Sequence, residues 1–378
     1  MVVLQALFLV VVIYLAIRLL HLDQVSEAPK LYFKEGSAFV KNILTNCSIL
    51  KDTYVPTLLW GKSGHLQTFI YAKLGRVKSP FPKGNRHYLE MPDSALMTFD
   101  VFEPYTSHIS KDDLTILICP GLANSSEASY VCTFVHYAQE RGYRVAVLNH
   151  LGALPSVKLN TPRMFTYGCT DEFSRMVDEV KKLYPNSKLL AVGFSMGGNI
   201  ITKYLGESKE NEKKFLCGIS VCQGYDALRC VPLLLDWHHM RRAYVYVMTA
   251  HQKTLLKHHH DVLLNEEVKQ KYGLDEDKIM ASTSLLELDE QYSSFTDYYS
   301  NVLLNAEDDP LVPPALVDLA KQHAETHENY LLVVTKHGGH LGYFQSGLVV
   351  PETITWLDRS LIQFADSVVS LQQFIRYK

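Results

Sequence analysis

The residues around Ser195 constrain the fold of this chain more than any other segment. A short apolar run, 189–192, predicts a buried strand that leads into Gly193-Phe194-Ser195-Met196-Gly197 and then into an apolar helical pattern, 200–205. A strand, a G-x-S-x-G turn and a helix in this order raise a serine above the edge of a sheet. Glycines are needed on both sides because the serine takes unusual backbone angles. A tight glycine turn with an incidental serine is the alternative, and the flanking strand and helix argue against it.

The body of the chain predicts an α/β fold. From about Asn85 onward, runs typical of buried strands occur at 115–119, 145–148, 189–194, 216–222 and 330–335. Amphipathic stretches separate them. The clearest predicts a helix with Thr170 as its N-cap, Asp171 and Glu172 in its first turn, and Phe173, Met176, Val177, Val180 and Leu183 facing inward. Such a succession builds an open, mostly parallel sheet covered on both faces, with ligands beyond the carboxyl ends of the strands.

Length and pattern divide the chain into three parts. At 378 residues it is large for one core and small for two full domains, so we expect one main domain with insertions. We expect a membrane anchor at 1–21, a juxtamembrane and N-terminal extension at 22–84, and the main domain at 85–378. Within the main domain, the looser, polar stretch from about 228 to 300 predicts a cap or lid insertion. Its consecutive histidines, 258–260, favour a solvated face over a metal site because neighbouring side chains on a helix diverge.

The N-terminal residues have the composition of a transmembrane helix. From Val2 to Leu20 the chain is apolar except for Gln5 and Arg18. About 20 residues at 1.5 Å rise cross a hydrocarbon core of ~30 Å, and an arginine near the end can extend to the headgroups. A cleaved signal peptide is the alternative, but the run lacks a basic leading region and a small-x-small cleavage site before His21. The charges that follow do not fix the orientation.

Composition excludes some function classes. The net charge of -3 supplies no basic field, so we do not expect a nucleic-acid partner. The seven cysteines are scattered without C-x-x-C spacing, which argues against a zinc site and against a dense disulfide framework. Two sequons, at Asn46 and Asn124, would accept glycans only if the body were lumenal or extracellular.

A serine at such a turn is a nucleophile only if a base takes its proton and an acid orients that base. In folds with this turn, the order along the chain is serine, then acid, then histidine. The apolar run 302–304 leads into a turn that offers Asp308 and Asp309 as candidate acids, although an acidic turn can also simply cap a helix. After the last strand, His337-Gly338-Gly339-His340 offers two bases. We favour His340 over His337 as the base, because more loop separates His340 from the strand. A buried structural histidine is the alternative.

Two backbone amides are candidates for binding a developing oxyanion. The helix after Ser195 directs its free N–H groups at the serine, so the Met196 amide is the first candidate. The second should follow an earlier strand, and Pro120-Gly121-Leu122 supplies a turn there, from which we choose the Leu122 amide. An ordinary Pro-Gly turn is the alternative. This chemistry requires no metal and no organic cofactor.

The motifs together resemble the AB hydrolase family of α/β-hydrolase fold proteins, and in particular its acylglycerol lipases. They include Trp60-Gly61-Lys62-Ser63-Gly64-His65, Cys119-Pro120-Gly121, the segments 147–155 and 163–170, the Ser195 turn, 305–310 and 337–340. The resemblance extends over nearly the whole chain.

The resemblance implies a fold, an activity and a site. It implies a mostly parallel sheet flanked by helices, a lid, and a single-pass type II membrane protein that hydrolyses lipid esters, monoacylglycerol foremost, and simpler esters. It assigns the acid to Asp309, which precedes x-Leu-Val-Pro as in these hydrolases, and the base to His340. Animal relatives are linked to steroid response, so a steroid is a further expected ligand.

One departure from the family keeps other functions open. Relatives have a longer stretch before the acid turn, whereas 298–301 runs directly into Val302, which would shorten the strand and displace Asp309. A displaced acid would favour a lipid- or steroid-binding sensor with weak or no catalysis. A second enzymatic alternative uses His108-x4-Asp113, a spacing found in some acyltransferases that also arises often by chance.

Overall fold

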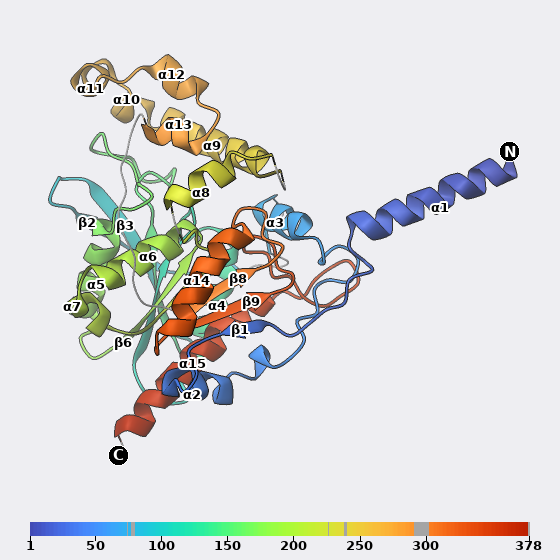
Figure 1. Cartoon of the computed structure of the whole chain (residues 1–378). Coiled ribbons are helices and arrows are strands. Elements are labelled where there is room, and N and C mark those ends of the chain that lie inside the picture. The colour runs from blue at the N-terminus through green and yellow to red at the C-terminus, as the bar shows by residue number, and fades with distance from the viewer. Residues whose placement is uncertain (74, 77–79, 226, 238–239, 291–301, 377–378) are drawn as a thin grey trace.

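The computed structural model describes residues 1–378 except 74, 77–79, 226, 238–239, 291–301 and 377–378. Its centre is a nine-stranded sheet in the order β1-β9-β8-β7-β6-β4-β5-β3-β2 (Figure 1). The strands are β1 (Lys30–Tyr32), β2 (Asn85–Glu90), β3 (Leu96–Phe102), β4 (Leu114–Cys119), β5 (Arg144–Asn149), β6 (Lys188–Phe194), β7 (Phe215–Val221), β8 (Val302–Ala306) and β9 (Leu331–Thr335).

The inner strands are parallel, as the apolar runs predict. β5, β4, β6, β7, β8 and β9 pair in parallel, so their carboxyl ends lie along one edge of the sheet. The antiparallel strands at the two edges are an addition to the predicted set: β2 and β3 at one edge, and β1 beside β9 at the other. β1 belongs to the segment that we assigned to an extension, and it ties this extension into the sheet.

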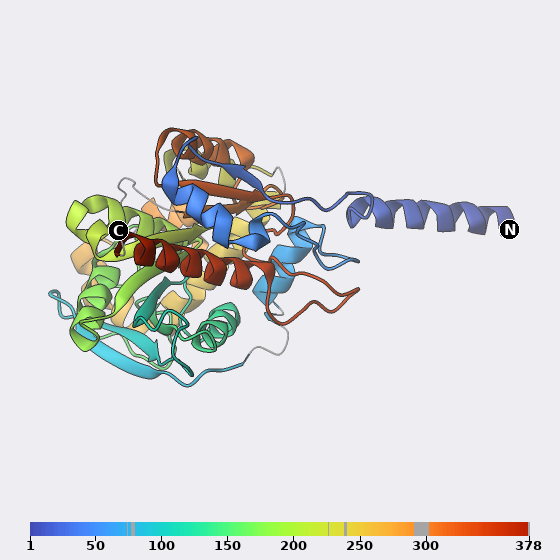
Figure 2. The same cartoon turned by 90° about the horizontal axis from the view of Figure 1, so that it is seen from below.

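Helices cover both faces of the sheet (Figures 1 and 2). One face packs against α2 (Ala38–Asn46), the 3-10 helix η1 (Ser48–Leu50), α4 (Ser129–Gln139) and α15 (Trp356–Arg376). The other face packs against α5 (Asp171–Leu183), α6 (Met196–Glu207) and α14 (Pro314–Thr326). The shorter α3 (Gly64–Lys73) and α7 (Lys209–Lys213) complete the body. Successive residues of each inner strand alternate between the two cores, so strands of this kind are apolar throughout.

Two details of α5 differ from the prediction. Thr170 stands at the N-cap position, but its side chain makes no capping hydrogen bond and donates to Glu207 Oε1 at 2.8 Å instead. Leu183, predicted to face inward, is exposed. The four other predicted residues of the inward face, Phe173, Met176, Val177 and Val180, are fully buried.

The stretch expected to form a lid is helical and lies above the carboxyl edge of the sheet (Figure 1). Its helices are α8 (Ala227–Leu234), α9 (Arg241–His258), α10 (His260–Leu263), α11 (Glu266–Tyr272), α12 (Glu276–Ala281) and α13 (Leu285–Glu290). The expectation of a solvated histidine face is wrong for His259, which is buried and donates through Nε2 to the Gly152 carbonyl at 3.1 Å. Burial lowers the pKa of His259. His259 therefore joins the helices α9 and α10 to the loop after β5.

The N-terminal helix stands apart from the rest of the protein. α1 (Val2–Leu19) has a mean hydropathy of 2.6, and none of its residues is buried. It projects from the body on the opposite side from the C-terminus (Figures 1 and 2). A helix that is apolar all round and packs against nothing is long and apolar enough to cross a membrane, although a signal sequence would have the same features.

The start of α15 connects two distant parts of the fold. Asp358 accepts hydrogen bonds from the Thr355 amide and hydroxyl at 2.9 and 2.7 Å, while the Thr355 hydroxyl accepts one from the Asp358 amide. This reciprocal cap faces Arg76, whose Nη2 lies 3.9 Å from Asp358 Oδ1, and both side chains are buried. Arg76 also donates to the Gly342 carbonyl at 3.0 Å. The pair thus joins α15 to the loop that carries His340.

We expect Asp358→Ala to lower the free energy of unfolding by about 3–5 kcal/mol, because it leaves the buried Arg76 guanidinium without its counter-ion. Urea unfolding of the detergent-solubilised protein, followed by circular dichroism, measures the change. Glu352→Ala is the matched control at the same helix start. Glu352 pairs with Arg359 at the surface, so its loss should cost less than about 1 kcal/mol. Equal losses in the two variants would contradict the argument.

Candidate active site

Ser195 stands between β6 and α6 in a strained conformation. Its backbone has φ 54° and ψ -119°, a region that a non-glycine residue rarely occupies. The two glycines make the turn possible. A Cβ at Gly197 would lie 2.0 Å from the Cys119 carbonyl oxygen, and one at Gly193 would lie 2.4 Å from the Gly197 carbonyl oxygen. The sequence therefore places the serine hydroxyl at the carboxyl edge of the sheet, where it is partly accessible.

The structure brings Ser195, His340 and Asp309 together in one chain of hydrogen bonds. His340 Nε2 lies 2.9 Å from Ser195 Oγ, and His340 Nδ1 lies 2.9 Å from Asp309 Oδ2. Asp309 and His340 are both buried. Because the carboxylate oxygen can only accept, Nδ1 carries the proton, and Nε2 is left with the lone pair that faces the serine hydroxyl.

Hydrogen bonds with backbone amides hold the candidate acid and the candidate base in place. Asp309 Oδ1 accepts from the amides of Leu311 and Val312 at 2.7 and 3.1 Å, which leaves Oδ2 directed at the histidine. The His340 amide donates to Thr68 Oγ1 at 2.8 Å. Residues 298–301, where the departure from the family lies, fall outside the described residues. The strand β8 after them runs from Val302 to Ala306, and Asp309 lies within hydrogen-bond distance of His340.

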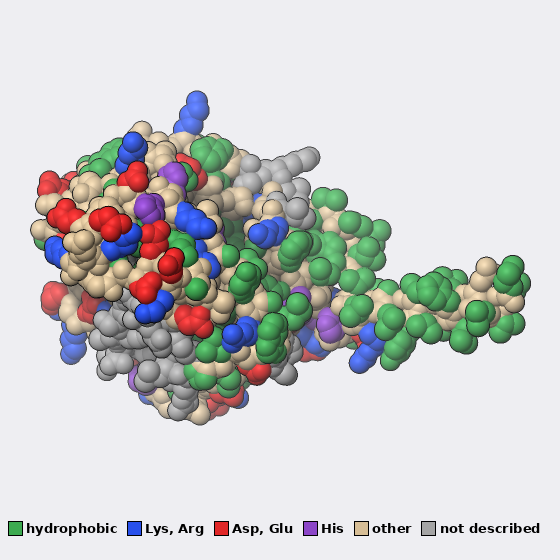
Figure 3. All heavy atoms as spheres, turned by 90° about the horizontal axis from the view of Figure 1, so that it is seen from above, with side chains coloured by type: hydrophobic (Ala, Val, Ile, Leu, Met, Phe, Trp, Pro, Cys, Tyr) green, Lys and Arg blue, Asp and Glu red, His purple; other side chains and the backbone are tan. Residues whose placement is uncertain are grey.

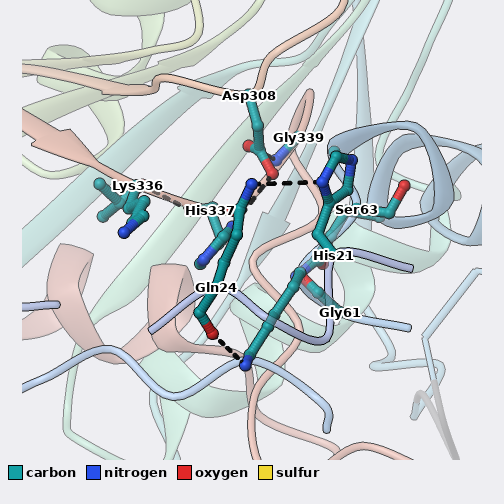
Figure 4. A network of polar contacts seen from close by, with 12 residues as sticks. His21, Gln24, Gly61, Ser63, Asp308, Lys336, His337 and Gly339 are labelled. Atoms are coloured by element: carbon teal, nitrogen blue, oxygen red, sulfur yellow. Dashed lines mark hydrogen bonds and ion pairs between the residues drawn. The ribbon is translucent and has the colours of Figure 1, made fainter. Parts of the chain in front are cut away.

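The neighbouring residues Asp308 and His337 make other contacts. Asp308 Oδ1 accepts from the Gly339 amide at 2.8 Å, and its Oδ2 lies 3.7 Å from Nδ1 of the buried His337. Desolvation raises the pKa of Asp308. Figure 4 shows these residues beside His21 and Gln24 of the segment that follows α1. Asp308 and His337 thus brace the loop of the base from the side of this segment.

The two candidate oxyanion amides lie close to Ser195. The Met196 amide is the first of α6, and Gly121 is adjacent to the serine, since a Cβ on it would lie 3.6 Å from Ser195 Cβ. Leu122 follows in the same turn, where the Asn124 side chain donates to its carbonyl at 2.8 Å. Among the described residues, neither amide has an acceptor within the chain. Both N–H groups therefore remain available to an oxygen on the substrate.

His150 supports this turn, and sequence reasoning did not assign it a role. It lies directly after β5, is buried, and donates through Nε2 to the Pro120 carbonyl at 2.9 Å. Burial lowers the pKa of His150 to about 4, so the ring is neutral at neutral pH. A lone histidine at the carboxyl end of a predicted strand was the available signal. Its partner is a backbone carbonyl thirty residues away, which no local pattern reveals.

Cys222 completes the surroundings of the acid. Its sulfur, a carboxylate oxygen of Asp309 and a ring nitrogen of His340 lie within 4.8 Å of one another, as in a metal site. The nitrogen and the carboxylate already share a proton, however, and burial raises the pKa of the thiol well above its usual value. A metal ion would have to displace the proton of His340 and that of the thiol. The arrangement favours proton transfer over metal binding.

Other residues singled out from the sequence lie elsewhere. Asn46 is exposed at the end of α2, whereas Asn124 is partly buried and its amide nitrogen serves the Leu122 turn. His108 hydrogen-bonds Ser110 and Asp366, and Asp113 binds Arg144. Asp113 precedes β4, at the opposite end of that strand from the Ser195 turn. The His108-x4-Asp113 spacing is therefore structural.

Comparisons with known proteins show the family of the chain. A family model described as the alpha/beta hydrolase fold matches residues 115–257. The human protein named Monoacylglycerol lipase ABHD2 is 44% identical over 381 residues, which cover 94% of this chain and 89% of the relative. The Drosophila melanogaster protein named Abhydrolase domain-containing protein 2 is 39% identical over 96% of both chains. A solved a/b serine hydrolase without lid from Xanthomonas campestris matches 77% of this chain and 96% of its own at 13% identity, with a TM-score of 0.46.

Burial of His150 predicts a pH dependence of stability. Its pKa falls from 6.5 to about 4 on folding, so the unfolded chain binds this proton more tightly. The free energy of unfolding should therefore be constant in this respect above pH 6.5 and should decrease as the pH falls from 6.5 to 4, by about 3 kcal/mol in total. His150→Gln, which retains a donor for the Pro120 carbonyl, should flatten this part of the profile. Urea unfolding between pH 4 and 8 tests it, and parallel profiles of variant and wild type would contradict it.

Proposed function

The chain belongs to the α/β-hydrolase family of its ABHD2 relatives, and on this basis we propose that it is a membrane-anchored serine hydrolase that cleaves carboxylic esters of lipids. The observation that carries the proposal is the continuous hydrogen-bond chain from Ser195 through His340 to Asp309, with 2.9 Å at each step. The amides of Met196 and Leu122, which have no acceptor among the described residues, add the means to stabilise an oxyanion.

The mechanism follows from these positions. Ser195 Oγ attacks the ester carbonyl carbon while His340 Nε2 takes its proton, and Asp309 stabilises the imidazolium through Nδ1. The amides of Met196 and Leu122 donate to the carbonyl oxygen as it becomes negative. When the tetrahedral intermediate collapses, His340 returns the proton to the leaving alcohol. Water, deprotonated by the same histidine, then attacks the acyl-enzyme and releases the carboxylic acid, which restores Ser195.

Monoacylglycerol is the substrate that we propose first. Relatives that are 43–44% identical over 94% of this chain carry the name monoacylglycerol lipase. The exposed apolar helix α1 supports the proposal, because an anchor in the bilayer would hold the serine next to esters that partition into the same leaflet. We further propose a single-pass type II arrangement with α1 as an uncleaved anchor. Resistance of the protein to carbonate extraction, with Val2–Leu19 still present by mass spectrometry, distinguishes it from a signal peptide.

Asp309→Asn should reduce the hydrolysis of a soluble short-chain ester by about 10⁴-fold, because the amide no longer holds His340 in the productive tautomer. Ser195→Ala should abolish labelling by a fluorophosphonate probe, and Asp309→Asn should slow it. Release of fatty acid from monoacylglycerol in vesicles should fall in parallel in both variants.

The neighbouring residues provide matched controls. Asp308→Asn keeps an oxygen that can accept from the Gly339 amide, and His337→Gln changes a ring that does not contact Ser195. Each should therefore retain most of the activity, whereas His340→Gln should lose it. If Asp308→Asn were as inactive as Asp309→Asn, the assignment of the acid would be wrong. Failure of the folded wild type to label would favour the ligand-binding sensor.

A further inference from the structure

Six exposed apolar side chains from two distant segments form one projecting surface, which we call the apolar tip. Val55, Leu58 and Leu59 come from the first segment, and Leu348, Val349 and Val350 come from the second. Each of them is between 42% and 65% exposed. Neither segment contains a charged residue, from Thr53 to Trp60 or from Leu341 to Pro351. A contiguous apolar surface of this kind usually marks a site of interaction.

Hydrogen bonds hold the two segments side by side. The amides of Leu58 and Leu59 donate to the carbonyls of Gly347 and Leu348, each at 3.0 Å. The Trp60 indole N–H donates to the Val349 carbonyl at 2.7 Å, and the Trp60 ring packs edge-on against Phe344 at 5.5 Å. The tip is therefore an ordered feature. It presents its apolar side chains outward while its backbone groups satisfy one another.

The tip lies next to the point where α1 leaves the body. Lys62, two residues after Trp60, donates to the carbonyls of Leu22 and Gln24 in the segment after α1. The Tyr54 amide donates to the Glu27 carbonyl at 3.1 Å at the other end of that segment. Both loops of the tip point toward the side of the body from which α1 projects (Figure 2). Figure 3 shows hydrophobic side chains gathered around the base of α1.

We propose that the apolar tip inserts into the interfacial layer of the leaflet that α1 enters, as a second membrane contact made by the folded body. This inference rests on the proposed anchoring of α1. The short segment after α1 is bonded to the same stretch that carries Leu58 and Leu59, so a membrane around α1 would meet the tip. Trp60, half-buried with its N–H satisfied, has the amphipathic character that favours the interface.

The contact would fix the active site relative to the lipid. The second segment of the tip follows directly from the loop of His340, and Gln67 Oε1 accepts from the Phe344 amide at 2.9 Å between them. A single helix leaves the body free to tilt and rotate about the connecting segment. A second contact removes that freedom and holds the serine edge of the sheet in one orientation to the bilayer.

Trp60 is a built-in probe of this contact. In full-length protein carrying Trp237→Phe, the remaining tryptophans are Trp60 and the buried Trp356. In proteoliposomes, we expect lipids brominated near the headgroup to quench the emission more than lipids brominated near the chain end. The triple variant Leu348→Ser, Val349→Ser and Val350→Ser should lose this quenching. Ile109→Ser, at an exposed apolar position far along the chain from both segments, should retain it.

Activity assays separate the contact from the chemistry. The triple variant should raise KM for monoacylglycerol in vesicles by roughly ten-fold, while hydrolysis of a soluble short-chain ester stays unchanged. Absence of quenching in protein that still resists carbonate extraction would overturn the tip contact alone. If carbonate extracted the protein, the proposed anchoring by α1 would be wrong. If the wild type did not hydrolyse the soluble ester, the proposed function would be wrong. Trp60 emission that depends on protein density but not on brominated lipid would assign the tip to a second copy of the chain.

Discussion

The close approach of the Ser195 turn to the strand beside it is the constraint on which the site depends. The α carbon of Gly197 lies so near the Cys119 and Pro120 carbonyls that no side chain fits there. This contact holds Ser195 at a positive φ that costs about 1–3 kcal/mol locally. The strain is sustained because β4 pairs with β6 over the full length of β4 in the core. The same contact brings the turn that carries Leu122 against the serine, so the packing of β4 against the Ser195 turn positions both the hydroxyl and a candidate oxyanion donor.

The sequence predicted the parts of the fold that are written in local patterns. The parallel strands are buried on both faces and therefore appear as continuous apolar runs, and the predicted α/β-hydrolase fold is confirmed. The edge strands β1, β2 and β3 were not found, because their pairing depends on partners elsewhere in the chain. His150 was missed for the same reason: its role is a hydrogen bond to the Pro120 carbonyl. Leu183 shows a different error, because it was predicted to face inward and is exposed. Helical periodicity alone does not reveal how far along a helix the buried face extends.

Asp308 and Asp309 show why the residues of a site are harder to choose than its fold. Both are acidic, adjacent and on the same turn, so composition and order along the chain cannot separate them. The structure distinguishes them by backbone amides: those of Leu311 and Val312 bind Asp309, and that of Gly339 binds Asp308. One carboxylate is thereby directed at His340 and the other at its loop. The family resemblance pointed to Asp309 through the Leu-Val-Pro sequence that follows it, and the amides of Leu311 and Val312 in that sequence are the ones that bind Asp309.

The N-terminal segment links these local arrangements to the membrane proposal. The segment that follows α1 is bonded to the body at two places. Lys336 binds Glu27, and Lys62 binds the carbonyls of Leu22 and Gln24. Lys336 stands directly before the histidine loop, and the Gly64 carbonyl lies against Gly339 in that loop. The loop of His340 and the segment after α1 are therefore held by residues that lie near one another in the sequence, Lys62 near Gly64 and Lys336 beside His337. In such a fold, α1 and the loop of His340 share one support, so the proposed membrane contact at the apolar tip would set the orientation of the candidate site itself.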